Sequence, residues 1–266
     1  MKLCFSTLGC FDKGLEDILL LAKSFSVAAI ELRGIGGALE NDDIAVFLPE
    51  HRESTRQKLF QSGLELPVLG TSCSFHRKER LNSSIEAGKR AIRIAEALGI
   101  KAIRVFGDRL TEDRQDGTER IADGILQLCE ASQSVDVLLE VHGDFNTVET
   151  LAPILDRLGD VRGFGLIWDI EHTHKPYGND WIPFYRFAKP YVKHVHIKDY
   201  SDDRQELTLI GEGSVPIIPI IRQLYDDGYE GCLSLEWEKK WHPELPDMER
   251  ALESFVSLLK KTEIRL

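Results

Sequence analysis

The sequence predicts an α/β fold, a single (β/α)8 barrel in which each parallel strand is followed by a helix. Two observations lead to this prediction. Apolar, β-branched runs of strand length alternate with amphipathic runs of helix length along the whole chain, and there are eight of each. Eight such units also account for the 266 residues, so no segment remains that could form a second domain. We therefore expect residues 1–266 to form one domain.

The expected strands are short apolar runs, which are typical of strands buried on both faces. They are Lys2–Ser6, Ala28–Arg33, Pro67–Ser72, Ala102–Phe106, Val135–Val141, Gly163–Trp168, Val192–Ile197 and Cys232–Trp237. Strands that are joined by helical crossovers run parallel. All eight are therefore expected to end at the same rim of the barrel, where the active site of such a barrel lies.

The expected helices lie near residues 15–25, 42–62, 83–98, 118–132, 147–158, 181–188, 215–227 and 247–260. Two of them carry capping signals. The segments Ser83–Glu86 and Asn146–Glu149 each place a capping side chain three residues before a glutamate, and a glycine follows each helix, at 99 and 159. The longest departures from a minimal unit are residues 40–63 and 201–215, and long loops often carry functional elements.

Composition argues against several classes of protein. The chain has 33 Lys and Arg against 44 Asp and Glu, a net charge of -11, which opposes binding to a nucleic-acid backbone. No apolar run approaches the roughly 18 residues of a membrane span, and the first residues lack the apolar core of a signal peptide. The five cysteines form no C-x-x-C pair, which indicates reduced thiols. We expect a cytoplasmic protein with no nucleic-acid or membrane partner.

Polar side chains gather at the ends of the last four strands. Because side chains alternate between the two faces of a strand, the acidic and imidazole groups at these ends can point into the barrel. Buried charges must be paired or bound to a metal. The candidate metal ligands are Glu140, Asp169, His196 and Glu236. Carboxylates with one imidazole suit Mn²⁺, Mg²⁺, Co²⁺ or Zn²⁺ better than a soft metal.

At several neighbouring positions a purely structural role competes with a functional one. His194 can pack structurally or orient a neighbour, and Glu171 and Glu238 are expected to be exposed or to support the ligands. The segment Gly211–Gly213 could hold a phosphate, because loops after the last strands of such barrels often do. The acidic Glu212 in its middle would repel that phosphate, so a plain turn is favoured.

At these residues the chain resembles the xylose isomerase-like barrel superfamily, which includes sugar-phosphate isomerases and epimerases, ketose 3-epimerases, hydroxypyruvate isomerase, inosose dehydratase and endonuclease IV. The resemblance is strongest in Leu139-Glu140-Val-His142, Trp168-Asp169-Ile-Glu-His172, His194-Val-His196-Ile-Lys198-Asp199 and Gly231-Cys-Leu-Ser-Leu-Glu236-Trp-Glu238. It covers nearly the whole chain. It implies a homo-oligomer, either a dimer or a tetramer.

In the epimerases that the chain resembles, the glutamates at the positions of Glu140 and Glu236 bind the metal and also exchange protons. The resemblance makes Asp169 and His196 ligands and places His172 against the substrate. Two positions depart from those epimerases. Asn146 stands where they carry a glutamate, and Asp202, with Arg204 nearby, stands where they carry an arginine. These departures argue against ketose 3-epimerisation of a free sugar, and the pair Lys198-Asp199 is more similar to the inosose dehydratase-type branch or to uncharacterised sugar-phosphate isomerases.

The expected function is that of an enzyme, a divalent-metal-dependent isomerase or epimerase of a sugar or sugar phosphate. It would work through a metal-stabilised enediolate, with Glu140 and Glu236 as acid and base. One divalent ion per chain is expected, with Mn²⁺ favoured. The residues expected to bind the small-molecule substrate are His142, His172, Lys198 and Arg204.

Three alternatives stay open. The same residues would serve a dehydratase of an inosose-like keto-polyol. An endonuclease IV-like phosphodiesterase would need a cluster of zinc ions, for which the early strands offer only Glu31, His76 and Asp108. A barrel that has lost catalysis and only binds a sugar is the third.

Overall fold

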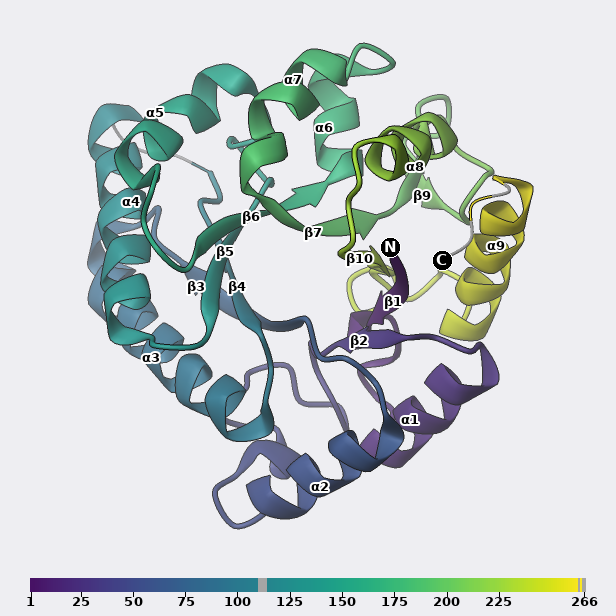
Figure 1. Cartoon of the computed structure of the whole chain (residues 1–266), viewed down its shortest axis with the longest axis horizontal. Coiled ribbons are helices and arrows are strands. Elements are labelled where there is room, and N and C mark those ends of the chain that lie inside the picture. Colours follow the sequence, from purple (N-terminus) through teal and green to yellow (C-terminus); the bar gives the residue numbers. More distant parts are fainter. Residues whose placement is uncertain (110–113, 263, 265–266) are drawn as a thin grey trace.

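Eight parallel strands form the centre of the computed structural model, which describes residues 1–109, 114–262 and 264. Figure 1 shows them ringed by helices. The strands are β1 (Lys2–Ser6), β2 (Ala29–Glu31), β3 (Val68–Ser74), β4 (Ala102–Phe106), β5 (Asp136–Glu140), β6 (Phe164–Asp169), β7 (Val192–Ile197) and β10 (Cys232–Leu235). Their positions agree closely with the expected ones.

The barrel closes between β2 and β3, where the pairing is irregular. The continuous order is β2-β1-β10-β7-β6-β5-β4-β3. At the seam, the Leu32 N–H donates to the Val68 carbonyl at 3.0 Å, and the Gly70 N–H donates to the Leu32 carbonyl at 2.8 Å. The α/β class and the (β/α)8 barrel predicted from the sequence are thus confirmed.

Helices cover the outside of the barrel. They are α1 (Leu15–Ser24), α2 (Arg52–Ser62), α3 (Leu81–Leu98), α4 (Arg114–Ala131), α5 (Val148–Leu158), α6 (Ile170–Tyr177), α7 (Ile182–Ala188), α8 (Ile217–Asp226) and α9 (Met248–Lys261), with short 3-10 turns η1 (Thr7–Cys10), η2 (Ala45–Phe47), η3 (Lys78–Arg80) and η4 (Lys189–Tyr191). Among the described residues, no helix is both long and apolar enough to cross a membrane. All five cysteines are buried and free.

Several boundaries differ from the expected ones, for local reasons. The region 42–62 divides into η2 and α2, and α6 is an additional helix. Helix α3 begins at Leu81, because the Ser83 hydroxyl donates back to the Arg80 carbonyl within the first turn instead of capping. Helix α5 is capped by Thr147 and not by Asn146, since Thr147 and Thr150 form the reciprocal capping box.

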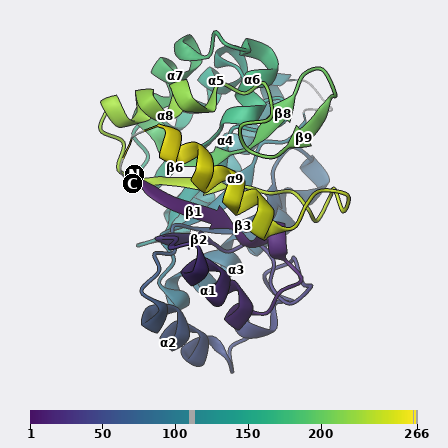
Figure 2. The same ribbon diagram turned by 90° about the vertical axis from the view of Figure 1, so that its right-hand side faces the viewer.

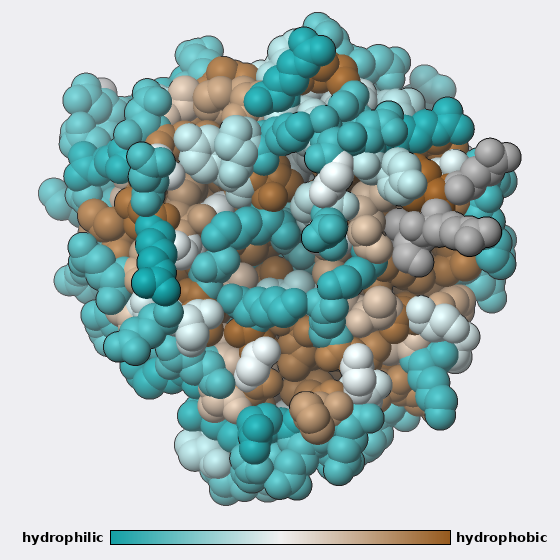
Figure 3. Space-filling view, in the orientation of Figure 1, coloured by the Kyte–Doolittle hydropathy of each residue, from teal (hydrophilic) through white to brown (hydrophobic). Residues whose placement is uncertain are grey.

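The interior of the barrel changes character along its axis. Inward positions near the start of the strands are apolar, and those near the strand ends are ionisable. The apolar inward residues are Cys4, Ala29, Val68, Ala102, Leu138, Ile167 and Cys232. The ionisable ones lie further along the strands. Glu31, Arg104, Glu140 and Asp169 each come two positions after an apolar inward residue, Glu236 comes four positions after Cys232, and His194 and His196 lie in β7. At the opposite, amino-terminal end that Figure 3 presents, polar side chains cover most of the rim.

The connection after β7 contains a small hairpin that the sequence did not indicate. Strands β8 (Asp199–Ser201) and β9 (Glu206–Thr208) pair antiparallel. Figure 2 shows the hairpin at the end of the barrel toward which β1 points. This is the rim at which the ionisable side chains lie, so the hairpin forms part of the wall around the site.

The buried carboxylate of Asp199 holds the loop that follows this hairpin. Its Oδ2 accepts from the backbone N–H groups of Gly211 and Gly213, at 2.8 and 3.0 Å. Its Oδ1 accepts from those of Tyr200 and Val215, at 2.9 and 3.2 Å. The glycine-rich turn therefore directs its N–H groups at a carboxylate of this chain, which agrees with a plain turn and not with a phosphate cradle.

Replacement of Asp199 by asparagine is expected to destabilise the protein by about 2–4 kcal/mol, because the amide NH₂ would face two N–H donors whichever way it is turned. Urea unfolding of the two proteins measures this change. The exposed Asp203→Asn is the matched control and should change the unfolding free energy by less than about 0.5 kcal/mol. Equal stabilities of Asp199→Asn and the parent protein would contradict the assignment.

Candidate active site

Four ligand-type side chains meet at the carboxyl ends of successive strands. Glu140 ends β5, Asp169 ends β6, His196 lies in β7 and Glu236 follows β10 directly. One ligand atom from each lies within 4.8 Å of those from the other three, and all four residues are buried. The structure thus brings together the four residues that the sequence marked as metal ligands.

The carboxylate of Asp169 has one oxygen engaged and the other directed toward the cluster. Its Oδ1 accepts from the backbone N–H groups of Glu171 and His172, at 2.9 and 3.1 Å, which caps the amino terminus of α6. Its Oδ2 lies 2.7 Å from Nζ of Lys198. The unexpected helix α6 therefore fixes the orientation of this candidate ligand.

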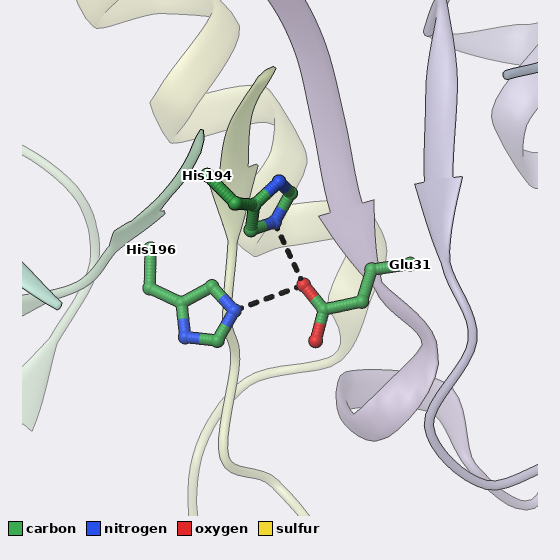
Figure 4. A group of neighbouring side chains, drawn as sticks. All are labelled: Glu31, His194 and His196. Atoms are coloured by element: carbon green, nitrogen blue, oxygen red, sulfur yellow. Dashed lines mark hydrogen bonds and ion pairs between the residues drawn. The ribbon is translucent and has the colours of Figure 1, made fainter. Parts of the chain in front are cut away.

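His196 is oriented by a carboxylate on the opposite side of its ring (Figure 4). Its Nε2 lies 2.9 Å from Oε2 of Glu31, and this oxygen also accepts from Nε2 of His194 at 3.0 Å and from the Ser234 hydroxyl at 3.1 Å. The other ring nitrogen of His196, Nδ1, lies 3.1 Å from Glu140 Oε1 and 3.3 Å from Glu236 Oε2. With its proton on Nε2, the ring presents the Nδ1 lone pair to the cluster, the arrangement usual for a histidine metal ligand.

Two buried cations connect the carboxylates of the cluster. Arg104 Nη1 lies 2.9 Å from Glu236 Oε1 and 3.1 Å from Glu140 Oε2. Lys198 Nζ lies 2.7 Å from Glu236 Oε2 and 2.6 Å from Glu238 Oε1, in addition to Asp169. Arg104 was not among the site residues expected from the sequence. The available signal was a charged residue at an inward position of an otherwise apolar strand, a placement that requires a partner inside the barrel.

The pKa values reflect this uneven distribution of charge. Burial opposes ionisation of Glu140, but Arg104 and His196 together outweigh it and lower the pKa. Burial acts the same way on Glu236, yet His196 and Lys198 hold its pKa well below the usual range. Burial raises the pKa of Asp169 to about 7, despite the nearby Lys198 ammonium. Two carboxylates are therefore firmly ionised, and the negative charge of the third is incompletely balanced.

The donor set fits a divalent cation. Three carboxylates and one imidazole are the hard and borderline ligands that Mn²⁺, Mg²⁺, Co²⁺ and Zn²⁺ accept. Glu140 Oε2 and Asp169 Oδ2 are buried and make ion pairs, but neither forms a hydrogen bond of good geometry with the described residues. The residues that would hold the cation are Glu140, Asp169, His196 and Glu236.

A cavity of about 290 Å³ opens beside this cluster. Its lining includes Glu140, Glu236, Lys198 and His142. The ring centroids of His142 and His172 are 4.1 Å apart. Burial lowers the pKa of both imidazoles, so both are neutral at neutral pH. Nδ1 of His142 is buried without a hydrogen-bond partner in the described part of the chain.

The remaining sequence candidates lie apart from the cluster or in supporting positions. Arg204 is exposed, is not part of the cavity lining, and its Nε pairs with Glu206 at 2.6 Å. Asn146 donates from Nδ2 to the His172 carbonyl at 3.0 Å, which ties it to a residue of the site. Glu171 is buried beside Lys175, 2.9 Å away, instead of being exposed.

A second group of residues whose ligand-type atoms lie close together consists of Glu31, His194 and His196. The hydrogen bonds drawn in Figure 4 already connect these three side chains. The two other early-strand candidates are His76 and Asp108, and Nδ1 of His76 lies 3.7 Å from Oδ2 of Asp108. Neither residue belongs to a group of possible metal ligands among the described residues. This arrangement offers little support for the zinc cluster of a nuclease.

Replacement of Glu31 by glutamine is expected to weaken metal binding by about 10- to 100-fold, because the amide no longer holds the His196 ring as a charged acceptor. Competition with a chromogenic chelator, using Zn²⁺ and Mn²⁺, measures the affinity. Glu65→Gln is the control, since Glu65 pairs with Lys2 and Lys101 at a part-exposed position. An unchanged metal affinity in Glu31→Gln would show that Glu31 does not orient His196 for metal binding.

Metal analysis of the purified protein is expected to find about one divalent ion per chain. In Asp169→Asn the occupancy should fall well below one, because the anionic oxygen is lost while the asparagine still caps α6. Circular dichroism should show an unchanged fold. About three ions per chain would instead indicate a nuclease-type cluster, and full occupancy in the variant would exclude Asp169 as a ligand.

A family model covers most of the chain. Residues 19–260 match the family model described as xylose isomerase-like TIM barrel. A curated inosose dehydratase of Clostridium perfringens is 26% identical over 138 residues, which are 45% of this chain and 46% of that protein, so the match spans about half the length of the relative.

Solved structures share the fold at low sequence identity. The probable 3-DHS dehydratase AsbF of Bacillus anthracis has a TM-score of 0.79 and 19% identity, with coverage of 98% of this chain and 99% of that one. The IolI protein, solved with a bound zinc atom, has a TM-score of 0.79 and 19% identity, with coverage of 98% of both chains. In this chain, the cluster of three carboxylates and one imidazole supports a divalent metal.

The structures that share this fold include a probable 3-DHS dehydratase and a D-tagatose 3-epimerase-like protein, each 19% identical to this chain. The family model covers far more than half of the chain. We conclude that this protein belongs to the xylose isomerase-like TIM barrel family.

Proposed function

We propose that the protein is a divalent-metal-dependent lyase that removes water from a small keto-polyol. The observation that carries this proposal is the placement of His142. Its neutral imidazole lines the same cavity as Glu140 and Glu236, and its Nδ1 has no hydrogen-bond partner among the described residues, so a base lies beside the position at which a carbonyl substrate would bind. A cavity of about 290 Å³ suits a small molecule.

The bound cation would act as a Lewis acid that makes the carbon next to the substrate carbonyl more acidic. His142 takes the proton from that carbon, and the electrons of the broken C–H bond form the new C=C bond. The hydroxyl group on the β-carbon leaves and receives the proton that His142 holds, so it departs as water. The step consumes no other reactant, and the base is restored.

The surroundings of the two glutamates favour His142 as the base. Arg104 contacts both Glu140 and Glu236, and each of them has a lowered pKa. A carboxylate held in its ionised form by a guanidinium serves better as a ligand than as a carrier of protons. Lys198, whose ammonium is kept protonated by Asp169 and Glu236, directs its three N–H donors at Asp169, Glu236 and Glu238, so it holds these carboxylates in place beside the cavity.

The isomerase or epimerase indicated by the sequence is the second candidate. Its support is the presence of Glu140 and Glu236 in the lining of one cavity, where two carboxylates could serve the two faces of a carbon atom. Structures similar to this chain include a D-tagatose 3-epimerase-like protein. In this alternative the proton returns to carbon and no hydroxyl leaves.

Incubation with Mn²⁺ or Zn²⁺ and a panel of inososes, ketoses and their phosphates in D₂O tests both candidates. We expect a product that is lighter by one water, seen by mass spectrometry, and loss of turnover after chelation. A deuterated product of otherwise unchanged composition would favour epimerisation or isomerisation. Absence of both exchange and turnover across the panel would refute the proposal.

Replacement of His142 by glutamine is expected to lower kcat by about 10²- to 10⁴-fold, the usual effect of removing a general base. Metal stoichiometry should stay unchanged, because His142 is not one of the four clustered ligands. His51→Gln, at an exposed position, is the matched control and should retain full activity. Activity of His142→Gln within a factor of about two of the parent would show that another residue is the general base.

A further inference from the structure

Three cationic side chains line the cavity beside the ligand cluster, and they differ in their partners. Arg104 and Lys198 are each held by carboxylates. Arg33 forms no ion pair with any carboxylate of the described residues, although it is 95% buried and belongs to the same lining. A buried guanidinium without an ionic partner is energetically unfavourable, so its presence needs a reason.

The backbone and stem of Arg33 are fixed in place. Its backbone N–H donates to Thr7 Oγ1 at 2.7 Å. Its aliphatic stem packs against the backbone of Gly70, where a Cβ would come within 2.6 Å of Arg33 Cδ. Glycine at position 70 therefore leaves the space that the arginine stem occupies, and the guanidinium is held in one position.

The guanidinium of Arg33 has N–H donors that no described residue accepts. Its Nη1 donates to the Leu39 carbonyl at 2.9 Å, and its Nη2 donates to the Ser72 hydroxyl at 3.0 Å. Of the five N–H groups of an arginine, three then have no hydrogen-bond partner among the residues that the structure describes. Glu40 is connected to Arg33 through Ser72, whose hydroxyl donates to Glu40 Oε1 at 2.6 Å. Anchoring a loop carbonyl would not by itself require a charge.

We propose that Arg33 binds an oxyanion of the substrate, so that the enzyme acts on an anionic keto-polyol and not on a neutral one. The planar fork of a guanidinium matches the paired oxygens of a carboxylate, and it also binds phosphate. Arg33 and the ligand cluster line one cavity of about 290 Å³, so a small molecule can reach both. This inference rests on the proposed function for its assumption that the cavity is the substrate site.

Binding of matched cyclic polyols tests the proposal without turnover. The Zn²⁺-loaded protein is titrated calorimetrically with myo-inositol, which is neutral, with quinate, which carries a carboxylate, and with myo-inositol 1-phosphate. We expect at least one of the two anions to bind about 10- to 100-fold more tightly than myo-inositol. The anion that binds more tightly identifies the group as carboxylate or phosphate. Equal binding of all three compounds would overturn the proposal.

Arg33→Met removes the charge and keeps most of the stem, so it should abolish the preference for the anion while metal stoichiometry is retained. Arg33→Lys keeps the charge without the fork and should retain part of the preference, which distinguishes loss of charge from loss of fold. Arg250→Met, at an exposed ion pair with Glu253, is the control. A full anion preference in a folded, metal-loaded Arg33→Met protein would mean that the metal itself or another cation binds the anion.

The two proposals can fail separately. An anion preference that depends on Arg33, combined with no turnover of any anionic or neutral keto-polyol, would refute the lyase and leave this binding site standing. Turnover of a neutral keto-polyol by a protein that shows no anion preference would refute only the role of Arg33.

Discussion

Ionisable side chains inside the barrel must neutralise one another, and the rest of the site depends on that constraint. An unpaired charge in such an interior costs several kcal/mol. Arg104 and Lys198 therefore lie between carboxylates contributed by different strands, and Glu31 receives two imidazoles. These contacts cross the barrel, so they tie its strands together and at the same time determine which carboxylates are ionised.

Hydrogen bonds then decide which atoms remain available for chemistry. Glu31 engages Nε2 of His196, so Nδ1 of that ring faces the other ligands. The amino terminus of α6 engages Oδ1 of Asp169, so Oδ2 faces them. His142, in contrast, lines the cavity, and its Nδ1 has no hydrogen-bond partner in the part of the chain that the structure describes. The difference between engaged and free atoms supports a division between metal ligands and a proton acceptor.

Much of this arrangement could be predicted from periodicity. The strand positions followed from short β-branched runs, and the four clustered ligands followed from the rule that parallel strands end at one rim. Arg104 and Glu31 were not recognised as organising residues, because their partners lie far away in the sequence. Asp199 was not recognised because its partners are backbone N–H groups of the following loop, which no side-chain pattern indicates. The boundary of α3 was displaced because a serine hydroxyl can bond back into a helix as easily as it can cap one.

The sequence by itself determined the barrel, the rim at which the candidate site lies and the identity of the four ligand-type residues, because alternation along a strand and crossover topology are local, repetitive properties. Only the tertiary structure decided what each charged group meets. It placed Arg204 against Glu206 at the surface, Arg104 among the carboxylates, and Arg33 in the cavity without an ionic partner among the described residues. Such pairings join strands that are distant in the sequence, and no local pattern records the distance between two side chains across a barrel.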